Sequence, residues 1–273
     1  MENESAQKGP ASSPRPRRRG RLLLIVGMAA TVVTAAVLVP LLLLKEEKRE
    51  PRSLLIPEGW RSSQVYAAVD KELGVAPGTT EKTARTAHLK LPRAARGNPE
   101  GYLFPATYPV DERTTPESLL SYMVNTAGKN FGSTPAAYRK VVIASIVQAE
   151  ADTAEDMGKV ARVIDNRLTR GMPLQMDSTL NYALKRSTLD TTHADTKIDT
   201  PYNTYERTGL PPTPIGNPGR QAMDATLKPP QGDWLYFVTV APGDTRFTAS
   251  YAEQRKNVEE FNANRRGASK NGG

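Results

Sequence analysis

The spacing of apolar and polar positions along the chain predicts where helices and strands lie. From Val65 to Leu73, apolar residues recur every three or four positions, and Gly74 follows them. That spacing is typical of a helix with one buried face, and glycine is a common residue just past a helix end. We therefore predict a helix here, and a further helix within residues 80–95.

Three more helices are predicted from capped starts. Thr115-Pro116 and Thr134-Pro135 each combine a cap residue with proline at the first helical position, and Thr153 precedes a third apolar stripe that Gly171 ends. The helix that starts after Thr134 contains the stretch VVIASIVQAE, which is almost wholly apolar until its last residue, Glu150. The pattern thus places one carboxyl at the end of a buried helix.

Strands are predicted where short apolar runs are bounded by turn residues, at 53–56, 101–104, 234–240 and 246–248. Ser250 and Glu253 form a capping box for a last helix that should end near Asn262. Residues 199–218 are rich in Pro, Gly, Asn and Thr and predict a loop. Together the pattern predicts an α+β fold.

One segment is too apolar for a globular domain. Residues 22–44 contain no charged residue over 23 positions, so as a helix they would span about 34 Å, against about 30 Å of bilayer hydrocarbon. Five arginines between residues 15 and 21 precede the segment. By the positive-inside rule we expect a single-pass anchor in the cell membrane, a cytoplasmic N-terminus and an extracytoplasmic body. The run is longer than that of a cleaved signal peptide.

The formal net charge of +8 resides in the flanking segments. The whole excess comes from residues 1–21, 45–52 and 264–273, so that residues 53–263 are neutral overall. A basic chain suggests nucleic acid only where the folded body carries the charge. We therefore expect no nucleic-acid partner, and we expect the two terminal segments to be disordered.

The chain lacks the residues that several kinds of catalytic site require. The chain has no cysteine and only two histidines, His88 and His193, which stand in no metal-ligand spacing. No G-x-S-x-G elbow, phosphate-binding loop or G-x-G-x-x-G motif is present. We expect neither a metal nor a cofactor, and what remains is carboxylate chemistry.

Glu150 is the candidate acid. At the C-terminal end of a helix the partial negative charge disfavours ionisation, and Asp152, Glu155 and Asp156 follow closely. A glutamate kept protonated near neutral pH is what a general acid needs for cleaving a glycosidic bond. Taken alone, these residues favour a solvated glutamate in an acidic loop between helices over a tuned acid.

The loops after Glu150 carry the groups that sugars bind. Residues 165–179, 201–205 and 209–219 supply amides, hydroxyls and aromatic rings, and prolines that hold the loops rigid. Amides recognise hydroxyl and acetamido groups, whereas rings pack on apolar sugar faces. A proline-rich surface loop without a ligand is the alternative.

Four stretches in this order resemble the YceG-like (MltG-type) endolytic murein transglycosylases: IASIVQAEA, VIDNRLTRGMPLQMDSTLNYAL, YNTYERTGLPPTPIGNPG and LYFVTVAPGDTRFTASYAEQRKNV. NPEGYLFPATYPV resembles the entry into the family's catalytic domain. The resemblance is strong over 98–263, which implies an α+β catalytic domain, and less complete over 53–97, which implies a small LysM-like βα module. Composition and hydropathy supply the other divisions: a basic cytoplasmic tail (1–21), a transmembrane helix (22–44), a tether (45–52) and a disordered tail (264–273).

The same resemblance implies the site residues. The family's catalytic glutamate falls on Glu150, and the saccharide-binding residues fall on Asn166, Gln175, Asp177, Tyr182, Tyr202, Asn203, Tyr205 and Asn217. The chain departs from the family pattern at Gln148, where many relatives have glutamate, and at Ser178, where proline is common. Glu150 is therefore the one acid within its motif.

What the resemblance implies for activity is a membrane-anchored lytic transglycosylase that cleaves nascent peptidoglycan strands, with the strands and the cytoplasmic membrane as partners and a peptidoglycan synthase as a further one. A muramidase-type hydrolase remains open, because Asp177 could act as a second catalytic carboxylate. A catalytically silent cell-wall-binding protein also remains open.

Overall fold

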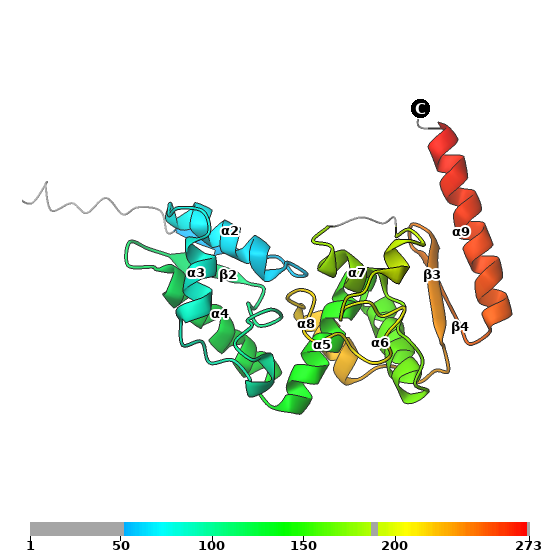
Figure 1. The fold of residues 1–273 in the computed structure, drawn as a ribbon, viewed down its shortest axis with the longest axis horizontal. Helices are drawn as coiled ribbons and strands as arrows, with labels where there is room; N and C mark the ends of the chain where they lie inside the picture. Colours follow the sequence, from blue (N-terminus) through cyan, green and yellow to red (C-terminus); the bar gives the residue numbers. More distant parts are fainter. Residues whose placement is uncertain (1–51, 187–190, 272–273) are drawn as a thin grey trace, which may run out of the picture. The chain divides into compact units, whose positions relative to one another are not determined.

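The computed structural model describes residues 52–186 and 191–271 (Figure 1). The chain divides after Glu50, and the basic tail, the span 22–44 and nearly all of the tether fall outside the described residues. Within the described part, none of the helices combines the length and the apolar character needed to cross a membrane.

The first sheet joins two distant segments. Strand β1 (Arg52–Leu55) pairs antiparallel with β2 (Thr107–Val110), so that Leu54 stands opposite Tyr108. Both of these side chains are buried and form part of the hydrophobic core on one face of the sheet. The pairing crosses the boundary predicted between residues 97 and 98.

Three helices accompany this sheet: α2 (Ser62–Leu73), α3 (Thr79–Thr86) and α4 (Pro116–Phe131). The prediction for α2 is confirmed: Val65 and Val69 are fully buried, and Gly74 ends the helix with a left-handed φ of 65°. Helix α3 is shorter than predicted and ends at Thr86, and a 3₁₀ turn, η1 (Arg93–Ala95), follows Pro92.

The strand predicted at 101–104 is wrong. This segment forms a turn in which the Tyr102 amide donates to the Pro99 carbonyl and Gly101 adopts a φ of 82°. A side chain at Gly101 would place its Cβ 2.5 Å from Pro214, so only glycine allows this approach. Tyr102 and Leu103 are apolar because they enter the core, and the strand forms further along as β2.

The second group of helices surrounds the end of the VVIASIVQAE stretch. Helices α5 (Pro135–Glu150), α6 (Ala154–Thr169) and α8 (Arg220–Leu227) pack on one another, and α7 (Asp177–Ala183) packs on α5. The capped starts are confirmed, since the hydroxyls of Thr134 and Thr153 each accept a backbone N–H three residues on. The short helices α7 and α8 were not predicted.

The C-terminal part is a hairpin and a helix. Strand β3 (Tyr236–Ala241) pairs antiparallel with β4 (Asp244–Thr248), with Phe237 opposite Phe247, and α9 (Tyr251–Asn271) packs against β3. The hairpin confirms the prediction, whereas α9 runs past Asn262 into the segment predicted as a tail. A 3₁₀ turn, η2 (Asp195–Lys197), lies in the loop region. The mixture of helices with small antiparallel sheets agrees with the predicted α+β class.

Candidate active site

Glu150 is the last residue of α5, and that helix is fixed in the core. Every residue from Val141 to Val147 is buried, so this part of the helix presents no face to solvent. Ser145 links the helix to a loop, because its hydroxyl accepts a 3.0 Å hydrogen bond from the Ile215 amide and donates to the Val142 carbonyl. The position of the Glu150 carboxyl is thereby determined by buried packing.

The start of α7 supplies the nearest partner of Glu150. The Ser178 hydroxyl donates a 2.6 Å hydrogen bond to Oε1 of Glu150. Desolvation by burial raises the pKa of Glu150, the charge of Asp177 raises this pKa further, and the hydrogen bonds from Ser178 act in the opposite direction. The net result is a carboxyl group biased toward its protonated form.

A second carboxyl stands beside the first. Asp177 opens α7 and accepts a 2.5 Å hydrogen bond from the Tyr205 hydroxyl. Burial raises the pKa of Tyr205, and the hydrogen bond to Asp177 raises it further, so the phenol remains a donor. Two predicted residues, Asp177 and Tyr205, are thus brought to Glu150 from separate loops.

Arg167, which the sequence did not single out, joins the loop before α7 to the loop before β3. Its guanidinium is buried in α6 and donates to the carbonyls of Leu235, at 2.6 Å, and Leu174, at 2.7 Å. The ring of Tyr236 lies 5.3 Å from the guanidinium carbon. A buried arginine needs carbonyl or carboxylate partners, but the motif D-N-R-L does not show that this arginine is buried.

Of the predicted binding residues, Asn166 bonds to the protein backbone and Gln175 bonds to another side chain. Asn166 donates its amide to the carbonyls of Gly232 and Trp234, at 3.2 and 2.9 Å. Gln175 is exposed and adopts a left-handed φ of 50°, and its side-chain oxygen accepts a 3.3 Å hydrogen bond from Arg167. Asn166 therefore holds the loop before β3, while Gln175 remains accessible to a ligand.

Asn203 and Asn217 are buried. The Asn203 amide donates to the carbonyls of Thr196 and Ile198, and its oxygen accepts the Tyr205 amide at 3.0 Å. Asn217 joins two further segments, because its side chain accepts the Leu103 amide at 2.8 Å and donates to the Trp60 carbonyl at 2.7 Å. Both asparagines shape the loops that surround the site.

Glu100 is a third carboxyl that the sequence reasoning did not consider. Its side chain is 4% exposed and accepts hydrogen bonds from the Ser62 amide at 2.9 Å and the Tyr182 hydroxyl at 3.0 Å. Burial raises the pKa of Glu100 to about 7, while these hydrogen bonds and the charge of Arg61 act in the lowering direction. The residue lies within the quoted segment NPEGYLFPATYPV, but nothing in that segment shows that the acid is buried.

Aromatic rings and a guanidinium gather near Glu100. The rings of Tyr182 and Tyr202 lie 5.1 Å apart, and the Tyr202 hydroxyl shares a 2.8 Å hydrogen bond with Thr213. The guanidinium carbon of Arg61 lies 5.3 Å from the centre of the Tyr182 ring. Two predicted residues, Tyr182 and Tyr202, thus lie together.

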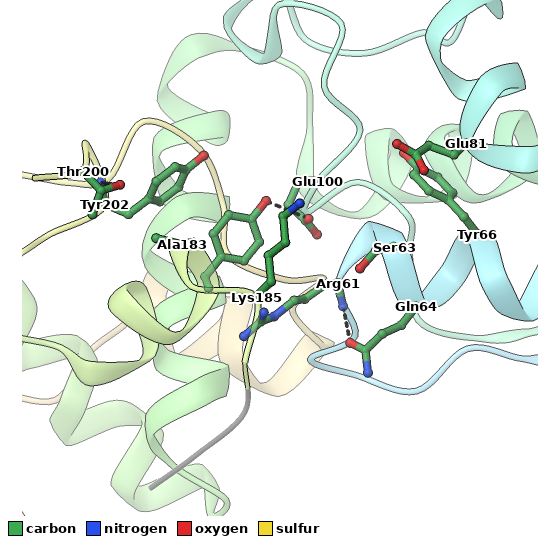
Figure 2. Close-up of a pocket in the computed structure, with 11 residues that line it drawn as sticks. Arg61, Ser63, Gln64, Tyr66, Glu81, Glu100, Ala183, Lys185, Thr200 and Tyr202 are labelled. Atoms are coloured by element: carbon green, nitrogen blue, oxygen red, sulfur yellow. Dashed lines mark hydrogen bonds between the residues drawn. The ribbon is translucent and has the colours of Figure 1, made fainter. Parts of the chain in front are cut away.

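The surface near these groups contains two hollows. The smaller one, of about 460 Å³, is lined by Trp60, Arg61, Ala149 and Ser178 among others, and so includes the neighbours of Glu150. The larger one, of about 670 Å³, is lined by Arg61 and by Glu100, Tyr182, Lys185 and Tyr202 among others (Figure 2). Because Arg61 borders both, we call the pair the cleft.

No group of three or more His, Cys, Asp or Glu side chains with the spacing of a metal site occurs in residues 52–186 and 191–271. The functional groups next to the smaller hollow are the Glu150 carboxyl, which is biased toward protonation, the Asp177 carboxyl, and the hydroxyl donors of Ser178 and Tyr205. These groups are suited to proton donation to, and removal from, an oxygen atom of a bound ligand.

Comparisons with known proteins agree with this arrangement. The model of the YceG-like family matches residues 28–260. The chain is 33% identical over 217 residues to an endolytic murein transglycosylase of Bacillus subtilis (strain 168), which covers 74% of this chain and 59% of that protein. It is 32% identical over 243 residues to an endolytic murein transglycosylase of Streptococcus pneumoniae serotype 2. That alignment covers 76% of this chain and 44% of the relative. The chain thus spans about half the length of these relatives.

A solved structure is also similar. The crystal structure of a putative yceG-like protein from Listeria monocytogenes superposes with a TM-score of 0.68 at 27% sequence identity. The superposition covers 76% of each chain. Its extent indicates that the arrangement of elements described above is shared.

Proposed function

This chain belongs to the YceG-like family, and on that basis we propose that it is an endolytic lytic transglycosylase of peptidoglycan. It cleaves the β-1,4 bond between N-acetylmuramic acid and N-acetylglucosamine within nascent strands and leaves 1,6-anhydromuramic ends, which limits strand length. The observation that carries the proposal is Glu150, a carboxyl with a raised pKa beside the smaller hollow. The names of the two relatives support the same reaction.

One carboxyl suffices for this reaction. Protonated Glu150 donates its proton to the glycosidic oxygen as the bond from C1 of the muramyl residue breaks. The resulting carboxylate then takes the proton from the C6 hydroxyl of the same sugar, whose oxygen forms the new bond to C1. Glu150 is protonated again at the end, and no water is consumed.

The neighbours of Glu150 serve the two halves of this cycle. The Ser178 hydroxyl, 2.6 Å from Oε1, stabilises the carboxylate that exists between the two proton transfers. Asp177 places negative charge nearby, which favours the protonated acid before the reaction and stabilises positive charge developing at C1. The hydrogen bond from Tyr205 keeps Asp177 in place.

The proposal includes the location of the enzyme. Residues 22–44 span the cell membrane once, residues 1–21 remain cytoplasmic, and the domain that carries Glu150 faces the cell wall beside a peptidoglycan synthase. The support is the uncharged run of 23 residues and the arginines before it. We assign residues 53–97 to a LysM-like module, with β1 and α2 as its first strand and helix. Protease treatment of spheroplasts tests the orientation: the domain should be digested from outside.

A muramidase-type hydrolase is the second candidate. Asp177 favours this candidate, because its carboxylate lies close enough to Glu150 to affect the pKa of Glu150. It could activate a water molecule as a base or attack the anomeric carbon as a nucleophile. The two reactions differ in their products. A hydrolase leaves ordinary reducing ends, which are one water heavier than anhydro ends.

Mass spectrometry of glycan strands distinguishes these functions. Purified full-length protein is incubated with uncrosslinked strands, in parallel with Glu150→Gln and the matched control Glu155→Gln, an exposed glutamate of α6. We expect 1,6-anhydro ends from the wild type and from the control, and a rate at least about 100-fold lower from Glu150→Gln.

The other outcomes are equally informative. Reducing ends from the wild type would establish the hydrolase and direct attention to Asp177. Full activity of Glu150→Gln would refute the assignment of the acid. Binding of strands without any cleavage would mean that the chain is a cell-wall-binding protein.

A further inference from the structure

The larger hollow of the cleft has features that cleavage at Glu150 does not use. Two residues, Arg61 and Gln64, line both this hollow and the smaller one. A ligand bound across the smaller hollow, next to Ser178, therefore has a path past Arg61 into the larger one. What enters the larger hollow must suit its charges.

Arg61 presents a positive charge that is already held in place. Its guanidinium donates a 2.7 Å hydrogen bond to the carbonyl of Arg186 and lies over the ring of Tyr182. Burial lowers the pKa of Arg61, and the charge of Glu100 partly offsets this. No carboxylate of the described residues forms an ion pair with Arg61, although the charge of Glu100 lies near enough to affect its pKa.

Lys185 adds a second positive charge, and its backbone conformation is unusual. It follows α7 with a φ of 53°, in the left-handed region where glycine is the common residue after a helix. The turn is closed by hydrogen bonds from Lys185 to Tyr182 and from Arg186 to Asn181. A lysine here costs free energy that glycine would not, which suggests that the side chain has a function.

The Lys185 side chain extends into the hollow. Figure 2 shows it pointing toward the region of Glu100, on the side of the cleft where Arg61 lies. Lys185 forms no ion pair with any residue that the structure describes. Two carboxyls line the same hollow: Glu81 is ion-paired with Arg85, whereas Glu100 accepts hydrogen bonds from Ser62 and Tyr182 and forms no ion pair in the described part of the chain.

We propose that the larger hollow binds the peptide that the muramyl residue carries, with Arg61 and Lys185 holding its free carboxylates. The inference rests on the proposed function, since it takes a peptidoglycan strand as the ligand. In such a strand the lactyl group is amide-linked to the peptide, so the carboxylates belong to the peptide and not to the sugars. Two cations that line one hollow and have no ion-pair partner among the described residues fit such a group, whereas neutral sugars would give neither cation a partner.

Binding to three defined strands of equal sugar number tests the inference. One strand carries its peptides, and the second carries the same peptides with amidated side-chain and C-terminal carboxyls. The third has had its peptides removed by an amidase, which leaves a lactyl carboxylate next to each muramyl ring but none at the position of the peptide. Dissociation constants are measured in full-length Glu150→Gln protein, in which cleavage is suppressed. The additional changes are Lys185→Glu and, as a control with the same charge change, Lys129→Glu on the exposed surface of α4.

We expect the strand with free peptide carboxylates to bind about five- to tenfold more tightly than either other strand. Lys185→Glu should abolish that preference, and Lys129→Glu should retain it. Thermal unfolding of the Lys185→Glu protein at the same temperature as its parent verifies that the fold is intact. Equal affinity for the three strands, or a preference that survives Lys185→Glu, would overturn the inference.

The cleavage assay keeps this result separate from the proposed function. If wild-type protein shows the preference in binding yet cleaves no strand, the proposed function fails and the peptide site stands. If it cleaves the strands with and without peptides at equal rates and binds them equally, the function stands and the peptide site fails. Binding of none of the strands would refute both.

Discussion

The hydroxyl of Ser178 lies 2.6 Å from Oε1 of Glu150 and donates a hydrogen bond to it. This bond stabilises the charged form of the acid and so lowers its pKa, against the effect of burial. In Ser178→Ala the pKa of Glu150 should therefore rise. The alkaline limb of the pH–rate profile should move to higher pH, while the rate at low pH changes by no more than about threefold. Ser121→Ala, in α4, is the control.

Asp177→Asn should move the alkaline limb of the pH–rate profile to lower pH. The charge of Asp177 raises the pKa of Glu150, so its removal lowers that pKa and reduces the fraction of protonated acid near neutral pH. Asparagine keeps an oxygen that can accept the hydrogen bond from Tyr205. We expect anhydro products at a reduced rate. If the variant were inactive at every pH while wild type produced reducing ends, Asp177 would be a catalytic carboxylate of a hydrolase.

Glu100 makes stability depend on pH. Its pKa is about 7 in the folded chain and 4.5 for the ordinary side chain, so between these values the folded state binds the extra proton. Stability is therefore lost as the pH rises from about 4.5 to about 7, by at most about 3 kcal/mol. In Glu100→Gln this loss should disappear.

Urea unfolding at pH 5 and pH 8 measures the effect. The difference in the free energy of unfolding between the two pH values should be smaller for Glu100→Gln than for wild type. Glu259→Gln, an exposed glutamate of α9, should behave as wild type. An unchanged difference in Glu100→Gln would show that Glu100 is ionised in the fold throughout this range.

Asn217→Ala should destabilise the fold by about 2 kcal/mol. The side chain is fully buried and joins the Leu103 amide to the Trp60 carbonyl, so alanine leaves two buried polar groups without a partner. The free energy of unfolding is compared with that of Asn125→Ala, an exposed position of α4. Equal values for the two variants would show that water replaces the lost amide.

Sequence patterns predicted the elements whose ends carry local signals. Thr134 and Thr153 accept N–H groups of their own helices, and Gly74 ends α2 because it can adopt a left-handed φ. The partners in these interactions are only a few residues apart in the chain, so the interactions can be inferred from the local sequence alone. The hairpin of β3 and β4 was predictable for the same reason.

Contacts between distant segments were not predictable in this way. The apolar residues after Gly101 read as a strand, but the close approach of Gly101 to Pro214 and the hydrogen bond from the Leu103 amide to Asn217 hold the segment in a turn. Helix α7 has too few residues to show a helical period. In both cases tertiary packing determines the conformation.

The residues of the candidate site also differ in how far the sequence could predict them. The position of Glu150 follows from the apolar run before it, and Asp177 and Tyr205 follow from the family resemblance. Glu100 and Arg167 escaped notice, because a carboxylate or a guanidinium in a sequence does not reveal its burial. Their partners, Ser62 and Leu235, lie 38 and 68 residues away in the chain.

The pairing of β1 with β2 affects how this protein can be divided or recombined. A chain cut at residue 97 would leave β2 with an open edge, and it would also lose Trp60 and Arg61 from the cleft. A graft of residues 53–97 onto another protein would transfer one strand of a sheet without its mate. Exchange of parts between relatives should therefore succeed only when the segment through Val110 travels as a whole.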